Sequence, residues 1–227
     1  MPELLPHGRE VLQRHGVAGV ARRAVDRARS ELQLRLWRDY QHVWHALRLD
    51  AQRPHPRLPD GLRLVIGEER HLPLLATIPA TGQLMARDWL RAGTRLFLVL
   101  DSDDRAVFAA WVFHREVSIS VAPGGWLPLP DGVGALDECY VAAGHRGRGI
   151  APAAWSLIAD ALEQEGDEAL LGIAVENDPS ARRALAKAGF DPITRMSARR
   201  RLFLVRLRGV PDGELGRRVV ERWPTGV

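Results

Sequence analysis

Residues 136–155 combine the residue types and spacing that best suit chemistry, because an apolar run enters a glycine-rich turn and then a helical pattern. The first amides of a helix have no intrahelical acceptor, and the helix dipole adds partial positive charge to them. Gly147 and Gly149 let the backbone approach a phosphate closely, and Arg146 and Arg148 add charge. The segment therefore predicts a pyrophosphate site, although an ordinary strand–turn–helix with solvated arginines has the same pattern.

The elements around this segment predict an α/β (α+β) fold with a central mixed sheet and helices on both faces. Short apolar runs separated by turn residues predict the strands, and two of them form a hairpin. The expected strands are 62–66, 95–100, 106–113, 135–142, 169–175 and 202–207, and the expected helices are two short ones within 68–92, then 149–165 and 179–188.

The first fifty residues predict an N-terminal helical extension. Leu32, Leu36, Val43 and Leu47 recur at spacings of four, seven and four residues over a predicted helix at 9–50. Three prolines and a glycine then end the pattern. We expect an extension and Pro-rich linker over residues 1–59, the main domain over 60–208 and a C-terminal tail over 209–227. The extension would pack on the main domain or on a second copy in a homodimer, and the alternative is a membrane-surface helix.

The composition excludes several classes of protein. A hydrophobic share of 46% and a charged share of 26% are typical of globular chains. The net charge is only +4, and Lys187 is the single lysine among 32 basic residues, which indicates codon bias and not a nucleic-acid footprint. No apolar run reaches the ~20 residues of a membrane span, and no Cys/His set has zinc spacing. We expect a cytoplasmic protein that binds neither metal nor nucleic acid.

A family resemblance is carried by two segments. Arg146-x-x-Gly149-x-Ala151 resembles the Arg/Gln-x-x-Gly-x-Gly/Ala signature of the GNAT acyltransferase superfamily. Residues 177–190 resemble the Asn-Pro-x-Ser…Lys-x-Gly-Phe segment of the same family, and the order of predicted elements agrees. The resemblance covers about residues 60–208.

The resemblance implies that the fourth and fifth strands splay apart and hold an acyl-CoA, acetyl-CoA by default, between them. It implies that the backbone of Val141 binds the pantetheine and that the amides of the turn bind the pyrophosphate. Asn177 is expected to contact the pantetheine because its amide both donates and accepts, although Asp178 takes that position when counted from Gly189. The turn residues concerned are Arg146, Gly147, Arg148, Gly149, Ile150 and Ala151.

The catalytic groups depart from the family's usual set. Leu185 stands where the family often has a tyrosine that protonates the departing thiolate. Strand alternation places Asp137 on the face of Cys139 and Val141, which makes Asp137 the preferred base or a group that anchors the substrate's positive charge. Glu138 is the second carboxylate, expected on the other face in a structural pair. Cys139 is expected to be a small wall residue, with an acyl-enzyme nucleophile as the alternative.

These residues predict an N-acyltransferase that moves an acyl group from a CoA thioester to a primary amine by direct attack in a ternary complex. The acceptor is a small-molecule or peptide amine, and His114 and Trp126 are further candidates near it. One alternative is a long-chain acyl-CoA or an acyl carrier protein as donor, docked by the Arg-rich first helix. Another is a non-catalytic acyl-CoA sensor or scaffold. A dinucleotide enzyme is disfavoured because Pro152 replaces the third glycine of its motif.

Overall fold

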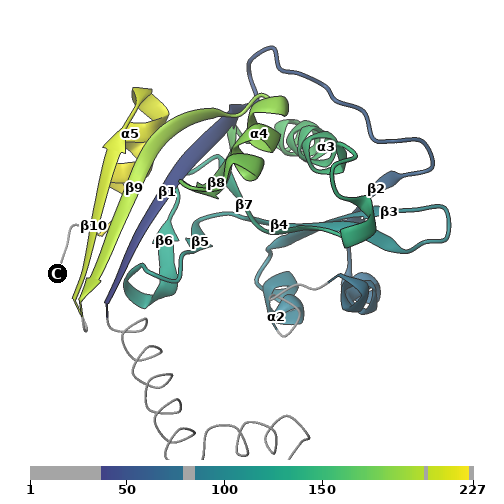
Figure 1. Cartoon of the computed structure of the whole chain (residues 1–227), viewed down its shortest axis with the longest axis horizontal. Helices are drawn as coiled ribbons and strands as arrows, with labels where there is room; N and C mark the ends of the chain where they lie inside the picture. Colours follow the sequence, from purple (N-terminus) through teal and green to yellow (C-terminus); the bar gives the residue numbers. More distant parts are fainter. Residues whose placement is uncertain (1–36, 79–84, 202–203, 225–227) are drawn as a thin grey trace, which may run out of the picture.

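The computed structural model describes residues 37–78, 85–201 and 204–224. An eight-stranded mixed sheet in the order β10-β9-β1-β8-β7-β4-β3-β2 forms its centre (Figure 1). The strands are β1 (Trp37–Arg48), β2 (Arg63–Gly67), β3 (Arg95–Leu100), β4 (Ala106–Phe113), β7 (Val133–Val141), β8 (Ala169–Val175), β9 (Asp191–Arg201) and β10 (Leu204–Pro211), and a separate hairpin pairs β5 (Glu116–Ser118) with β6 (Trp126–Pro128).

Both faces of the sheet are covered, as the sequence predicts. The α-helices α3 (Ile150–Gln164) and α4 (Pro179–Lys187) cover one face through an apolar cluster that includes Ile158 and Leu162. The opposite face packs against α5 (Gly213–Glu221), the β5–β6 hairpin and the short helices η1 (Glu69–Thr77) and α2 (Ala86–Arg91). Short 3₁₀ turns η3 (Pro123–Gly125) and η4 (Ala143–His145) precede β6 and α3. The predicted hairpin of β3 and β4 and the predicted sequence β7, α3, β8, α4 are confirmed.

The helix expected over residues 9–50 is wrong for residues 37–48, which form β1, and residues 9–36 lie outside the described residues. β1 pairs antiparallel with β8 on one side and with β9 on the other. Trp44 and Ala46 pack into the cluster beneath α5, whereas Leu47 packs into the cluster beneath α3. A strand buried on both faces carries apolar residues without alternation, so the spacing of Val43 and Leu47 imitates a helix.

The C-terminal region also differs from expectation. The predicted last strand at 202–207 is replaced by β9 and β10, with residues 202–203 outside the described part of the chain. Residues 209–227 were expected to form a tail, but β10 runs to Pro211 and α5 follows it. Leu215, Val219 and Trp223 are buried against the sheet, and the Trp223 ring lies 5.2 Å from that of Trp44. The sheet therefore extends on both sides of the expected 60–208 domain.

The two central parallel strands separate midway along their length. β7 and β8 pair in parallel from the pair of Val133 with Ala169 to the pair of Leu136 with Gly172, where the pairing ends. Beyond that point β7 stays paired with β4 as far as Val141, and β8 stays paired with β1 as far as Val175. Because each strand is held by its outer neighbour, an opening forms between them.

Candidate active site

A groove of about 880 Å³ occupies the opening between β7 and β8. Its walls come from the second halves of β7 and β8, the turn before α3, the starts of α3 and α4, and residues 118–120 at the end of β5. The groove brings together most of the predicted site residues, namely Asp137, Glu138, Val141, Arg146, Gly147, Gly149, Ile150 and Ala151. Arg148 and Asn177 are not among the residues that line it.

The turn before α3 has the geometry that an anion requires. Gly147 and Gly149 have φ of 76° and 77°, in the left-handed region that favours glycine. A Cβ built on either glycine would meet nothing within 4 Å, so the space above the turn is open. α3 begins at Ile150 with no side-chain cap and no acidic residue in its first turn. Its first amides, those of Ile150 and Ala151, are therefore oriented for a ligand's phosphate.

The start of α4 provides an internal contrast. The carboxylate of Asp178 accepts hydrogen bonds from the backbone amides of Ser180 and Ala181, each at 3.0 Å. Asp178 lines the groove, whereas Asn177, preferred from the sequence, does not. Because Asp178 already caps α4 with a negative charge, the uncapped start of α3 is the better anion site of the two.

Arg146 and Val141, both predicted to contact the donor, contact each other. The Nε of Arg146 donates a hydrogen bond to the carbonyl oxygen of Val141 at 3.2 Å. This bond ties the guanidinium to the end of β7, at the side of the groove next to the glycine turn.

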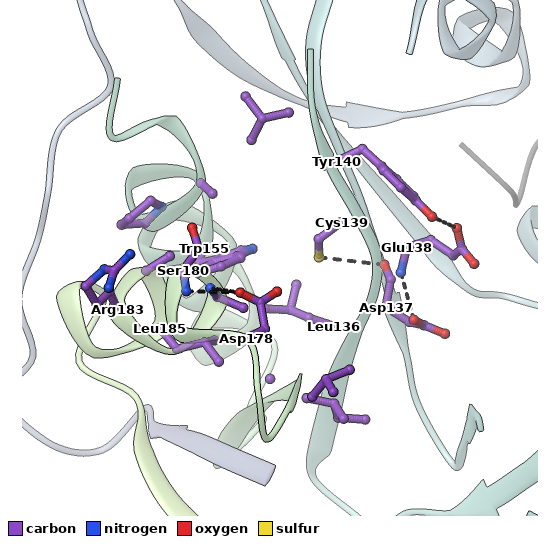
Figure 2. Close-up of a pocket in the computed structure, with 18 of the residues that line it drawn as sticks. Leu136, Asp137, Glu138, Cys139, Tyr140, Trp155, Asp178, Ser180, Arg183 and Leu185 are labelled. Atoms are coloured by element: carbon purple, nitrogen blue, oxygen red, sulfur yellow. Dashed lines mark hydrogen bonds between the residues drawn. The ribbon is translucent and has the colours of Figure 1, made fainter. Parts of the chain in front are cut away.

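A β-bulge in β7 changes the side of the strand to which the Asp137 carboxylate points. Tyr140 pairs with Ala109 and Asp137 with Trp111, so two residues of β7 lie opposite one of β4, and Glu138 has a φ of 49°. A bulge interrupts strand alternation. The expectation that Asp137 shares a face with Cys139 and Val141 is therefore wrong, whereas Glu138 lies on the side opposite Cys139, as expected (Figure 2).

Figure 2 shows the result of the bulge. Cys139 points toward Trp155 of α3, whereas Asp137 and Glu138 point to the opposite side of β7. The groove thus has an α3/α4 side, next to the glycine turn, and a carboxylate side. Ser118, the last residue of β5, and Ser120 line the groove together with Asp137.

Asp137 has the electrostatics of a base that works near neutral pH. Burial raises the pKa of Asp137 to about 6, the Glu138 carboxylate adds to the increase, and a hydrogen bond from the Glu138 backbone amide opposes it. That bond, to Oδ1, is 2.8 Å long and fixes the carboxylate against the bulge. A group with this pKa is mostly ionised at pH 7 and remains basic enough to accept a proton.

Glu138 is held in a local pair, as the sequence analysis expected. The hydroxyl of Tyr140 donates a hydrogen bond to Oε2 of Glu138 at 2.8 Å. The pair sits on the same strand as Asp137, so Glu138 contributes negative charge to this side of the groove in addition to a structural contact.

His42 is a groove residue that the sequence analysis missed, because residues 9–50 were interpreted as a helix. It lies on β1 opposite Val175, and alternation places it on the face of Trp44. Its Nδ1 is buried and has no hydrogen-bond partner among the described residues. Burial lowers the pKa of His42, which favours a neutral ring. The concentration of aromatic residues in 37–44 was the available signal for a strand.

Two further candidates from the sequence lie away from the groove lining. His114 pairs with Asp167, with 2.9 Å between Nε2 and Oδ2, and Trp126 packs near Phe113 at a ring separation of 6.0 Å. Both are therefore explained by structural contacts.

Cys139 has the properties of a wall residue. Burial raises the pKa of its thiol to about 12, and the nearby Asp137 carboxylate adds to the increase. The thiolate is the nucleophilic form of cysteine, so a thiol with this pKa is unreactive at neutral pH.

For the acyl transfer that the sequence predicts, we therefore expect the Cys139→Ala variant to keep at least roughly a third of the wild-type rate. Steady-state rates and intact-protein mass spectrometry with acyl-CoA would check this. An acylated Cys139, together with an inactive alanine variant, would show instead that transfer passes through a covalent enzyme.

Two searches over the described residues bear on other classes of protein. No helix there is long and apolar enough to cross a membrane. No group of three or more His, Cys, Asp or Glu side chains there is arranged to hold a metal ion.

The splayed parallel strands and the glycine-rich start of α3 define an acyltransferase type of α/β fold, and comparison with known proteins agrees. The model of the Acetyltransferase (GNAT) family matches residues 35–190. The chain therefore belongs to the GNAT acetyltransferase family. The match begins just before β1, which is consistent with β1 being part of the sheet.

Solved structures share this fold at low sequence identity. A GCN5-related N-acetyltransferase from Sphaerobacter thermophilus has a TM-score of 0.52 and 17% identity, covering 82% of this chain and 57% of the other. A protein from Novosphingobium aromaticivorans, described as a GNAT-family acetyltransferase, has a TM-score of 0.50 and 19% identity, covering 71% and 64%. This chain thus spans less than two thirds of those structures. No curated protein matches the sequence.

Proposed function

We propose that this protein transfers an acyl group, acetyl by default, from a CoA thioester to a primary amine by direct attack. The observation that supports it most is the groove, which joins the open glycine turn at the start of α3 to Asp137 across the splayed strands. The amides of Ile150 and Ala151 would hold the pyrophosphate, and Arg146 would add positive charge. The bound thioester supplies an activated acyl carbon and a thiolate leaving group.

The carboxylate side of the groove would receive the amine. A primary amine with a pKa near 10 is mostly protonated at pH 7, so it must lose a proton before attack. Asp137 would accept that proton, directly or through a water molecule. The Glu138 carboxylate would add to the negative potential that attracts a cationic acceptor.

This function is tested by offering the purified protein acyl-CoAs of increasing chain length with a panel of small amines and peptides. We expect release of free CoA thiol that depends on the amine, with the acylated amine identified by mass spectrometry. CoA binding without turnover of any amine would instead support a non-catalytic acyl-CoA sensor.

A further inference from the structure

Trp155 places a hydrogen-bond donor in the wall of the groove. Its side chain is only 7% exposed, it lines the groove from α3, and its ring packs edge-on against Phe190 at 6.0 Å. Its indole nitrogen is buried and has no hydrogen-bond partner among the described residues. The indole N–H can only donate, and a buried donor without an acceptor is unfavourable. An acceptor from a ligand in the groove would remove this cost.

Two other buried indole nitrogens without partners provide a comparison. Trp44 and Trp223 pack against each other with ring centroids 5.2 Å apart, and neither lines the groove. Their N–H groups are enclosed in the core, so no ligand can reach them. Of these three tryptophans, Trp155 is the one whose N–H borders the groove.

The surroundings of Trp155 suit a sulfur atom. Trp155 points across the groove toward Cys139 (Figure 2), and the proximity of its indole N–H lowers the pKa of the Cys139 thiol against the larger upward effect of burial. The indole N–H thus favours a thiolate over a thiol. The two groups do not reach hydrogen-bond geometry, so the N–H stays available to a ligand. Leu136 and Leu185 in this part of the wall are apolar, and the nearby Asp178 carboxylate is occupied by the backbone amides of Ser180 and Ala181 (Figure 2). Leu185 cannot donate a proton or a hydrogen bond to a departing thiolate.

Trp155 also lies where a donor bound in the groove would place its thioester. The groove is lined by the glycine turn, where α3 begins, and by Asp137, which points to the other side of β7 from Trp155. A donor anchored by its pyrophosphate at the turn must pass the α3/α4 side before its acyl carbon can meet an amine near Asp137. Trp155 and Cys139 line that intervening stretch.

We propose that the indole N–H of Trp155 donates a hydrogen bond to the thioester sulfur and stabilises the thiolate as it departs. This inference rests on the function proposed above. The amine nitrogen bonds to the acyl carbon, the bond from that carbon to sulfur breaks, and sulfur keeps the electron pair. The ammonium gives one proton to Asp137 before attack, and the nitrogen gives its second proton to solvent water as the amide forms. Indole does not give up its own proton, so the thiolate is protonated later by solvent, and Trp155 acts by hydrogen bonding alone.

The test compares Trp155→Phe, which keeps an aromatic ring beside Phe190, with Trp44→Phe, which removes an N–H outside the groove. For each protein we would measure kcat, the Kd of CoA, and the pKa of the bound CoA thiol from its thiolate ultraviolet absorbance. A hydrogen bond to a charged group predicts that Trp155→Phe lowers kcat about 10- to 100-fold. It also predicts a rise of about one to two units in the pKa of the bound thiol, with Kd changed less than about threefold.

The outcomes separate the two proposals. If wild-type protein neither binds CoA nor acylates any amine, the proposed function is wrong. If it does both, but Trp155→Phe matches Trp44→Phe in kcat and in the thiol pKa, only the role of Trp155 is wrong. Should Trp155→Phe fail to fold, wild-type protein still decides the question. An indole N–H signal of Trp155 that does not move downfield in the NMR spectrum when CoA is added would show that this group donates no hydrogen bond to the ligand.

Discussion

Replacing Gly149 by aspartate is expected to abolish CoA binding, with a loss in affinity of at least roughly 100-fold. Gly149 has a φ of 77°, and the space above it is open, so an added side chain would project where a phosphate would lie. The carboxylate would also cancel the positive end of the α3 dipole and repel the pyrophosphate. Isothermal titration with CoA, together with thermal unfolding, measures the binding loss separately from any loss of stability.

Gly166 supplies a matched control for this substitution. It lies just beyond the other end of α3, has a φ of 91°, and a Cβ there would also meet nothing within 4 Å. Gly166→Asp therefore introduces the same side chain with a similar backbone strain, but away from the groove. We expect CoA affinity to be retained in this variant. Equal losses in the two variants, or normal affinity in Gly149→Asp, would place the anion site elsewhere.

Replacing Asp137 by asparagine is expected to lower the transfer rate at pH 7 by about 10²- to 10⁴-fold, the usual contribution of a general base. The amide oxygen of asparagine can still accept the bond from the Glu138 backbone amide, so the bulge is preserved. Part of the rate should return at high pH, where the amine loses its proton unaided. If Asp137 only anchors a cationic acceptor, KM rises and kcat changes little.

The raised pKa of Asp137 predicts two pH dependences. In wild-type protein the base is lost as pH falls through about 6, so kcat/KM should fall about tenfold per unit below that value. This limb should be absent from Asp137→Asn.

The fold itself should respond in the opposite sense. Because the folded-state pKa exceeds the unfolded value, the ionised carboxylate destabilises the fold, and the penalty develops as pH rises from about 4 to 6. Asp137→Asn should therefore unfold at a higher temperature than wild type at pH 7, and the two should converge below about pH 4.

Glu138→Gln is the matched control, because it neutralises the adjacent carboxylate on the same side of β7. The Tyr140 hydroxyl can still donate to the amide oxygen of glutamine, so the local pair survives. We expect its kcat to change less than about tenfold. A larger effect in Glu138→Gln than in Asp137→Asn would transfer the role of base to Glu138. Wild-type kcat and KM across pH 6–9 in Asp137→Asn would leave Asp137 without either role.

Local sequence patterns were sufficient to predict the glycine turn on the α3/α4 side of the groove. The turn from Arg146 to Ala151 follows from glycines that adopt positive φ and from a helix that must begin somewhere after them. The β3–β4 hairpin, β8 and α4 were predicted for the same reason, since each depends on a short run of residues and on its own turns or caps. Arg146-x-x-Gly149-x-Ala151 indicated the family, which the family model confirms.

The tertiary structure alone decided how the side chains on the carboxylate side of the groove are arranged. β1 is buried on both faces because the cluster beneath α5 covers one face and the cluster beneath α3 covers the other, and burial on both faces removes the alternation by which a strand is recognised. His42 was missed as a result. The bulge at Glu138 is defined by the pairing of β7 with β4, so the sequence of β7 alone cannot predict it. That one extra residue turns Asp137 away from Cys139, to the other side of β7. The sequence thus determined which residues are available for acyl transfer, and pairing between strands distant in the chain decided which way they point.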